Sequence, residues 1–216
     1  MIINNLYENF PMFKILEEYL LFNAIVAGGC FKNILLGQDI KDVDLFFRNE
    51  KDFKRALSYY SGRRKFQQIY ENNKAVGFLH CGRNIKIDLV RSVFNKPENL
   101  IEKFDFTVAK MAMYKETIPE TNYATNSFEE IVGIDNSNYI SDTKLIHHIK
   151  FFEHLFLKRL VIDADITFSS STFERVLKYT KYGFNLCRES KIKMIQALQD
   201  SKDESISDSL YDGGFD

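Results

Sequence analysis

A glycine pair set between an apolar strand and a short helix constrains the fold of this chain more than any other feature. Residues 24–27 (AIVA) have the short, fully apolar character of a buried strand, which Gly28 and Gly29 end. Residues 31–36 then have the character of a short helix. Residues 41–47 (KDVDLFF) alternate charged and apolar side chains before becoming fully apolar, which is typical of a strand with one polar end. The order predicts strand, tight turn, helix and acid-bearing strand.

The periodicity of apolar residues predicts further helices and strands. The predicted helices cover residues 11–22, 50–60, 97–104, 142–160, 172–182 and 189–199. The predicted strands cover residues 66–71, 75–80, 84–91 and a segment around Phe128–Ile134. Ser171 and Glu174 have the spacing of a capping box for the fifth of these helices, and Gly183 lies just past its end.

This order of elements predicts an α+β protein, with a mixed β-sheet flanked by helices and a small α-helical part after it. We expect a head domain over residues 1–114, a helical region over residues 115–200 and a flexible tail over residues 201–216. The tail holds five acidic residues and a single lysine, Lys202. Such a composition favours a flexible segment over a packed one.

Composition narrows the classes of protein to which this chain can belong. Apolar residues make up 45% and charged residues 27% of the 216 residues, which is typical of a globular protein with a core. The 29 basic and 30 acidic residues nearly cancel, so whole-chain charge gives no argument for a nucleic-acid partner. The three cysteines lack zinc or disulfide spacing, and no apolar run is long enough for a membrane span. We therefore expect a cytoplasmic protein without a membrane partner; its oligomeric state is left open.

Three aspartates are the candidate catalytic and metal-binding residues. Asp42 and Asp44 are two residues apart on a predicted strand, so both side chains project from the same face of the sheet. Asp88 interrupts the apolar run of residues 85–90 (IKIDLV), and we expect it on a neighbouring antiparallel strand. Three carboxylates at one sheet edge repel one another unless cations neutralise them. The triad therefore predicts a site for Mg²⁺ or Mn²⁺, with room for two ions about 3.5 to 4 Å apart.

The glycine pair adds a phosphate-binding element to this prediction. Glycines between a strand and a helix let the backbone approach a ligand closely, and the amides that begin a helix attract phosphate. Each feature also has a purely structural reading, because many glycine pairs are only turns and many half-exposed strands alternate charged residues. The joint order of strand, Gly28-Gly29, helix and the strand of Asp42 and Asp44 favours the functional reading.

Three motifs resemble those of a known family. Residues 27–37 (AGGCFKNILLG) followed by residues 42–46 (DVDLF) resemble the GGxVRDxLLGxxxxDxDL signature of CCA-adding tRNA nucleotidyltransferases and bacterial poly(A) polymerases. These enzymes belong to the DNA polymerase beta superfamily. Residues 105–108 (DFTV) resemble the RRDFTIN motif that joins the head to the neck, and residues 175–184 resemble the neck motif RAxRF…GF.

The resemblance implies a nucleotidyltransferase head and assigns roles to particular residues. Asp42, Asp44 and Asp88 would hold the metal ions, and Lys32 stands where the family has arginine. The residues that the resemblance places against the nucleotide are Gly28, Gly29, Lys32, Asp105, Arg175 and Lys178.

The expected reaction is transfer of a nucleoside monophosphate from a nucleoside triphosphate to an acceptor hydroxyl, with release of pyrophosphate. The resemblance implies an RNA 3′ end as acceptor, from tRNA or another RNA, and leaves a protein or a small molecule as alternatives. A second hypothesis is a non-catalytic nucleotide-binding or interaction module of the same fold. It is motivated by Lys103 and Phe104, which stand where the family has two arginines, and by the absence of an EDxxR motif before Arg175.

Overall fold

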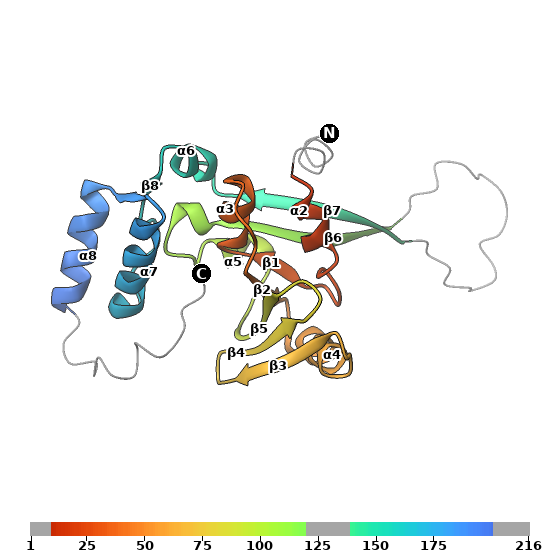
Figure 1. Cartoon of the computed structure of the whole chain (residues 1–216). Coiled ribbons are helices and arrows are strands. Elements are labelled where there is room, and N and C mark those ends of the chain that lie inside the picture. Colours follow the sequence, from red (N-terminus) through yellow and green to blue (C-terminus); the bar gives the residue numbers. More distant parts are fainter. Residues whose placement is uncertain (1–9, 120–138, 201–216) are drawn as a thin grey trace, which may run out of the picture.

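A mixed seven-stranded sheet organises the chain in the computed structural model, which describes residues 10–119 and 139–200 (Figure 1). The strands are β1 (Ile25–Ala27), β2 (Asp42–Phe47), β3 (Phe66–Glu71), β4 (Ala75–His80), β5 (Ile85–Phe94), β6 (Met111–Pro119) and β7 (Tyr139–His147). Their order across the sheet is β3-β4-β5-β2-β1-β6-β7. Every neighbouring pair is antiparallel except β2 with β5, which run parallel.

Helices flank this sheet, and the helices of the C-terminal part of the chain form a separate group beside it. They are α2 (Met12–Glu17), α3 (Cys30–Leu35), α4 (Glu50–Ser61), α5 (Pro97–Ile101), α6 (Phe151–Phe156), α7 (Ser169–Lys181) and α8 (Arg188–Asp200), with a 3₁₀ turn, η1, at Thr107–Ala109. Two short strands, β8 (Arg159–Leu160) and β9 (Asn185–Leu186), pair in parallel beside α7 and α8. Figure 1 shows α7 and α8 side by side at one end of the molecule. The predicted α+β class, with a C-terminal helical part, is confirmed.

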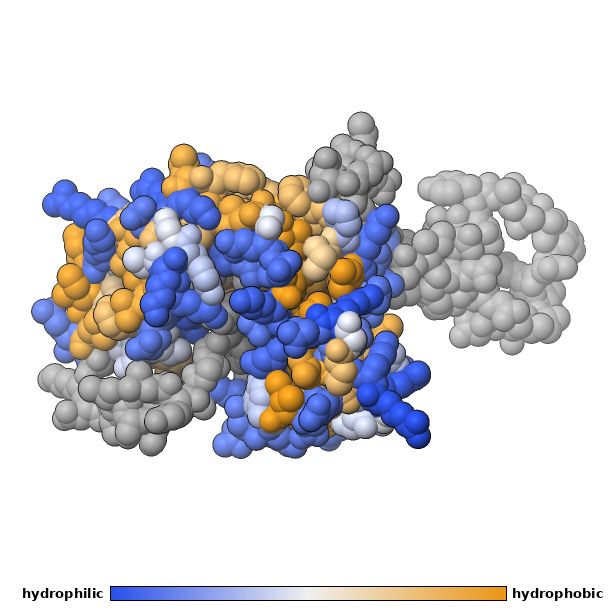
Figure 2. Space-filling view, viewed as in Figure 1, coloured by the Kyte–Doolittle hydropathy of each residue, from blue (hydrophilic) through white to orange (hydrophobic). Residues whose placement is uncertain are grey.

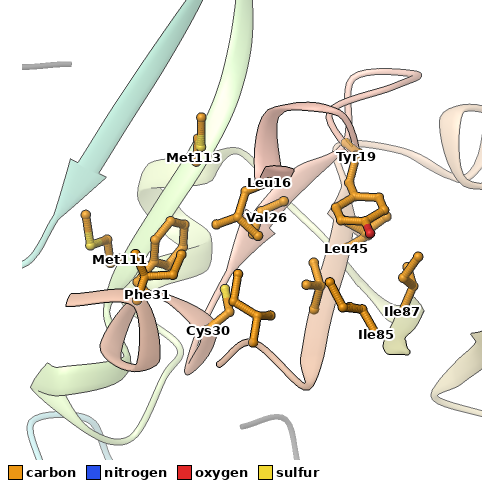
Figure 3. Packing of buried hydrophobic residues seen from close by; sticks show 14 of the residues in the cluster. Leu16, Tyr19, Val26, Cys30, Phe31, Leu45, Ile85, Ile87, Met111 and Met113 are labelled. Atoms are coloured by element: carbon orange, nitrogen blue, oxygen red, sulfur yellow. The ribbon is translucent and has the colours of Figure 1, made fainter. Parts of the chain in front are cut away.

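The two faces of the sheet pack against different clusters. The larger cluster includes Val26, Leu45 and Ile87 with Phe31 of α3, and Figure 3 shows Val26 and Leu45 between Phe31 on one side and Ile87 on the other. A smaller cluster on the opposite face includes Phe46 and the other strand residues whose side chains point away from the larger cluster. Because successive side chains of a strand point to opposite faces, Asp44 and Asp88 share the face of the smaller cluster.

The glycine pair forms the sharp turn that the sequence predicts. Gly28 has a φ of 98°, a conformation that residues with a side chain rarely adopt, and its N–H donates to the carbonyl of Met111 at 3.2 Å. Gly29 is the N-cap of α3. The strand–turn–helix–strand unit of β1, α3 and β2 is therefore confirmed.

One predicted helix is wrong. Residues 142–160 form the second half of β7, then α6 and β8, and not one continuous helix. Residues 139–147 pair along their whole length with β6, so strand pairing overrides their helical periodicity. The strand predicted around Phe128–Ile134 lies outside the described residues. The domain boundary expected after residue 114 falls inside β6, and the division into domains stays a prediction.

Two predicted helix boundaries also differ. The first helix ends at Glu17 and not near residue 22; Phe22 and Asn23, each with a φ of 56°, lie outside it. Helix α7 begins at Ser169 with Phe168 as N-cap and without a side-chain cap, so the predicted capping box is absent. Its other end agrees with the prediction, since Gly183 follows α7 with a φ of 84°.

Hydrophobic side chains reach the surface mainly around the C-terminal helices, whereas hydrophilic residues cover much of the rest of the face in Figure 2. The exposed ones include Phe156, Leu157, Ile192 and Ile195. None of the helices in the described part of the chain is long and apolar enough to cross a membrane.

The end of α7 gives a test of this backbone geometry. Replacing Gly183 with alanine should destabilise the protein by about 1 to 2 kcal/mol, because a Cβ strains the left-handed backbone although no atom lies within 4 Å of it. Thermal unfolding measures the change, at roughly 2 to 4 °C per kcal/mol. Gly82→Ala is the matched control, since Gly82 has equal space and no positive φ. Equal stability of both variants would contradict the assignment.

Candidate active site

The three candidate aspartates lie on one face of the sheet, at the junction of β2 and β5. Asp44 and Asp88 are direct partners in the register of these strands, and Asp42 pairs with Lys86. Side chains of directly paired residues share a face. The expectation of an antiparallel neighbour is wrong, because the chain passes through α4, β3 and β4 before β5 returns parallel to β2. The register nevertheless brings the carboxylates together.

The site is poor in compensating charge around Asp44. This side chain is 7% exposed. Burial, and then the negative charges of Asp88 and Asp42, raise the pKa of its carboxyl group well above the usual range. The positive charges of Lys86 and Lys178 oppose this shift. Ionised Asp44 is therefore unfavourable unless a further cation approaches.

Two lysines border the carboxylates. Lys86 Nζ lies 2.8 Å from Asp88 Oδ2. Lys178 comes from α7, and burial lowers the pKa of its ammonium group while the charges of Asp42 and Asp44 raise it. The site therefore combines acids from two strands with a lysine from the C-terminal helical part. The nucleotide contact expected of Lys178 stays a prediction.

The donor set fits a hard divalent cation. Carboxylate oxygens are the ligands that Mg²⁺ and Mn²⁺ prefer, and Asp88 Oδ1 is buried without a hydrogen-bond partner among the described residues. Within residues 10–119 and 139–200, no group of three or more His, Cys, Asp or Glu side chains is arranged to hold a metal ion. Asp88 is paired with Lys86 instead. The metal role of Asp42, Asp44 and Asp88 stays a prediction.

The glycine pair lies at the same end of the sheet as Asp42. Ala27 pairs with Asp44 in the antiparallel register of β1 and β2, and Gly28 and Gly29 continue from β1 in the direction of Asp42. Because the sheet occupies the N–H of Gly28, that group is not available to a ligand in this conformation. The phosphate contact of the glycines stays a prediction.

Lys32 is turned toward α7. Its side chain is buried, and its Nζ lies 4.4 Å from the centre of the Tyr182 ring and 5.6 Å from that of Tyr179. Burial, and then the charges of Lys178 and Lys158, lower the pKa of its ammonium group to about 8. Lys32 thus connects α3 with α7, and its expected nucleotide contact is not tested by this arrangement.

Asp105 and Arg175 form an ion pair, although they are 70 residues apart in the sequence. Thr172 Oγ1 donates a hydrogen bond of 2.8 Å to Asp105 Oδ2. The pair thus fixes α7 against the segment that precedes η1. The structure therefore brings together two residues that the sequence predicted to contact one nucleotide.

A cavity of about 380 Å³ lies beside this ion pair. Its lining includes Phe46, Phe104, Asp105, Phe168, Arg175 and Tyr179. Phe46 is two residues after Asp44 on β2 and shares its face, so the cavity and the carboxylates lie on the same face of the sheet. Lys178 lies three residues after Arg175, about one turn along α7. The volume is within the range of small-molecule sites.

Sequence reasoning missed two residues at the carboxylates. Lys86 could have been found, because the alternation in residues 85–90 places it on the same face as Asp88. Tyr70 could not, since it comes from β3 and lies in line with Asp88 across Gly77 of β4, an arrangement that no motif indicates.

Comparison with known proteins identifies the family. The sequence model of the Gabija anti-defense 2 family matches residues 3–158. The chain belongs to this family. A relative named Gabija anti-defense 2, from Bacillus phage SPbetaL7, is 21% identical over 178 residues, which are 82% of this chain and 38% of the relative. The chain thus spans well under half the length of this relative.

Solved structures share the fold of this family member. A CCA-adding enzyme in complex with CTP matches with a TM-score of 0.57 at 14% identity, over 86% of this chain and 43% of that chain. The Thermotoga maritima CCA-adding enzyme complexed with tRNA matches with a TM-score of 0.53 at 16% identity, over 86% and 42%. At these identities the likeness shows the fold alone. The chain therefore has a nucleotidyltransferase fold and spans less than half of either enzyme.

The ion pair beside the cavity gives a test of how α7 is held. Arg175→Ala should destabilise the protein by about 1 to 3 kcal/mol, because Asp105 then keeps a largely buried charge whose remaining side-chain partner among the described residues is Thr172. Chemical denaturation measures the loss. Lys181→Ala, on an exposed position of the same helix, is the control and should change stability by less than about 0.5 kcal/mol. If the two side chains interact, the double variant Asp105→Ala with Arg175→Ala loses less stability than the sum of the two single variants. A loss equal to that sum would contradict the pairing.

Proposed function

We propose that the chain is a metal-dependent nucleotidyltransferase, which moves a nucleoside monophosphate from a nucleoside triphosphate to an acceptor hydroxyl and releases pyrophosphate. One observation carries this proposal: the register of β2 and β5 places Asp44 directly beside Asp88, with Asp42 on the same face. The adjoining cavity lined by Arg175 and Asp105 supplies space for the nucleoside. The nucleotidyltransferase fold agrees with this reading.

The chain's own residues supply position and charge. Asp42 and Asp44 present the negative charges that hold Mg²⁺ or Mn²⁺, with Asp88 beside them. When bound, such a cation stabilises charge on the phosphate oxygens and lowers the pKa of the attacking hydroxyl. Lys178 of α7 lies close enough for its charge to interact with Asp42 and Asp44, and there its ammonium group attracts the phosphates.

The remaining assigned residues surround the nucleotide in this proposal. Gly28 and Gly29 let the backbone approach the triphosphate, and Lys32 supports α7, which carries Arg175. Asp105 orients Arg175 through their ion pair, so that the guanidinium group borders the cavity. A fixed guanidinium fork discriminates between ligands better than a mobile one.

Two acceptor classes follow from different observations. The motifs shared with CCA-adding enzymes favour an RNA 3′ end, of tRNA or another RNA. Membership of a family named for anti-defense activity favours a macromolecule of an antiviral defence system, modified by nucleotidyl transfer to a protein hydroxyl. A non-catalytic module that binds nucleotide is the competing reading, because Lys103 and Phe104 replace two arginines of the related motif.

The activity test compares carboxylate variants. Purified protein is incubated with each labelled nucleoside triphosphate, Mg²⁺ or Mn²⁺, and either total RNA or a bacterial protein extract. Asp42→Asn combined with Asp44→Asn should lower incorporation by more than about 100-fold, since changes behind metal ligands alone cost 10- to 100-fold. Asp39→Asn, an exposed neighbour, should leave incorporation unchanged.

The outcomes separate the readings. Label in RNA supports the first acceptor class and label in protein the second. Unchanged incorporation in the double variant would overturn the proposal. Metal-dependent nucleotide binding without incorporation on any acceptor would favour the non-catalytic module.

The crowded carboxylates give a second test, on stability. Without divalent cations, Asp44→Asn should raise the melting temperature by a few degrees, because it removes a buried charge beside Asp88 and Asp42. Mg²⁺ should stabilise the wild type, since a ligand that binds only the folded state raises the melting temperature. The variant should gain much less. Differential scanning fluorimetry with and without 10 mM Mg²⁺ measures both melting temperatures. This concentration is roughly 10 to 100 times an ordinary dissociation constant for Mg²⁺ on a protein, so the site would be nearly saturated.

A further inference from the structure

A tyrosine from the edge of the sheet reaches the carboxylates across an intervening strand. Tyr70 of β3 pairs with Gly77 of β4, and Gly77 pairs with Asp88 of β5. A Cβ built on Gly77 would lie 2.0 Å from Cε1 of the Tyr70 ring. The ring therefore occupies the space above Gly77, and it lies on the face of the sheet that carries Asp88.

Lys86 completes the group around Asp88. Its Nζ lies 2.8 Å from Asp88 Oδ2 and 5.1 Å from the centre of the Tyr70 ring. Burial, and then the hydrogen bond and charge of Asp88, raise the pKa of the Tyr70 hydroxyl. Two side chains from two strands therefore contact or border one carboxylate.

The second oxygen of the Asp88 carboxylate is not held by Lys86. Asp88 Oδ1 is buried and has no hydrogen-bond partner among the described residues. A buried acceptor without a partner is costly and rare, and it points to a ligand that supplies the missing interaction. Asp88 thus differs from Asp42, which is exposed at the end of β2.

Packing alone does not explain Tyr70. Strand β3 is the edge strand, and five of its six side chains are exposed or half-buried. A ring over Gly77 could be supplied by phenylalanine, which has no hydroxyl group to direct at Asp88. Glycine at residue 77 therefore leaves space for Tyr70, whose hydroxyl group brings a hydrogen-bond donor to the site.

We propose that Tyr70 is a positioning residue, which together with Lys86 fixes the carboxylate of Asp88 so that Oδ1 stays available to the reacting groups. Gly77 provides the gap through which Tyr70 acts. The inference rests on the proposed nucleotidyl transfer and deepens it by separating two roles. Asp42 and Asp44 interact with the charge of Lys178, whereas the orientation of Asp88, which has a direct ion pair with Lys86, is set by the protein in advance.

Two substitutions test this role from different sides. Tyr70→Phe removes the hydroxyl and keeps the ring, and Gly77→Ala keeps the hydroxyl and displaces the ring. Each should lower kcat by about 10- to 100-fold with little change in the KM for the nucleoside triphosphate, because loss of a group that orients a ligand has this size. Tyr59→Phe and Gly82→Ala are the matched controls, since Tyr59 lies on α4 and Gly82 has open space around it.

A second readout does not need turnover. Mn²⁺ affinity, measured by electron paramagnetic resonance on the full chain, should fall about 10-fold in Tyr70→Phe. In an Asp88→Ala background, Tyr70→Phe should have no further effect, since alanine has no oxygen for the Tyr70 hydroxyl to contact and both changes then remove the same interaction. Thermal unfolding checks that each variant remains folded.

The outcomes distinguish this inference from the proposed function. Wild-type incorporation with unchanged kcat and Mn²⁺ affinity in Tyr70→Phe overturns the role of Tyr70 and leaves the transferase. A Mn²⁺ affinity that depends on Tyr70, in a chain without incorporation, supports the positioning role and overturns the transferase. Absence of Mn²⁺ binding by the wild type overturns both. An equal loss in Tyr59→Phe overturns the specificity of the effect.

Discussion

The parallel pairing of β2 with β5 is the interaction on which the candidate site depends. It is the one parallel contact in a sheet whose other neighbours run antiparallel, and it places Asp44 directly beside Asp88. A shift of one residue in this register would move one carboxylate to the opposite face, into the larger apolar cluster. The register is held by the residues of alternate parity, such as Leu45 and Leu89, which are fully buried on that face. Apolar packing on one face of the sheet thus holds the carboxylates of Asp44 and Asp88 side by side on the other face, although they repel each other.

Helix α7 links the aspartates of β2 and β5 to the rest of the molecule. It carries Arg175, which pairs with Asp105, and Lys178, whose charge interacts with Asp42 and Asp44. Tyr182 and Tyr179 at its C-terminal end contact Lys32 of α3. The same helix therefore borders the cavity, faces the carboxylates and contacts the helix that follows the glycine pair. Its position is set by long-range contacts, among them the ion pair of Arg175 with Asp105, and these contacts are not visible in the local sequence.

The local elements near the site could be predicted, and the long-range ones could not. Strand β1, the glycine turn, α3 and β2 follow from short patterns with strong punctuation, such as Gly28 with its positive φ. Strand β7 was mistaken for a helix, because its only strong determinant is pairing with β6. Asp42, Asp44 and Asp88 were found as a group, but the parallel orientation of β5 and the contact of Tyr70 depend on strand order. Strand order is a property of the whole sheet.

The arrangement around Asp88 separates this chain from a generic carboxylate triad. If all three aspartates had equivalent surroundings, their mutual repulsion would leave each side chain to turn away toward solvent. Lys86 offsets part of that repulsion at Asp88 without an external ion, while burial and the charges of its neighbours raise the pKa of Asp44. The protein therefore neutralises Asp88 by a direct ion pair, whereas Asp42 and Asp44 interact with the charges of nearby lysines. If the proposed function holds, this inequality implies an order of events: a cation that compensates Asp44 would complete the site, and the side chain of Asp88 would already be held by Lys86 when it binds.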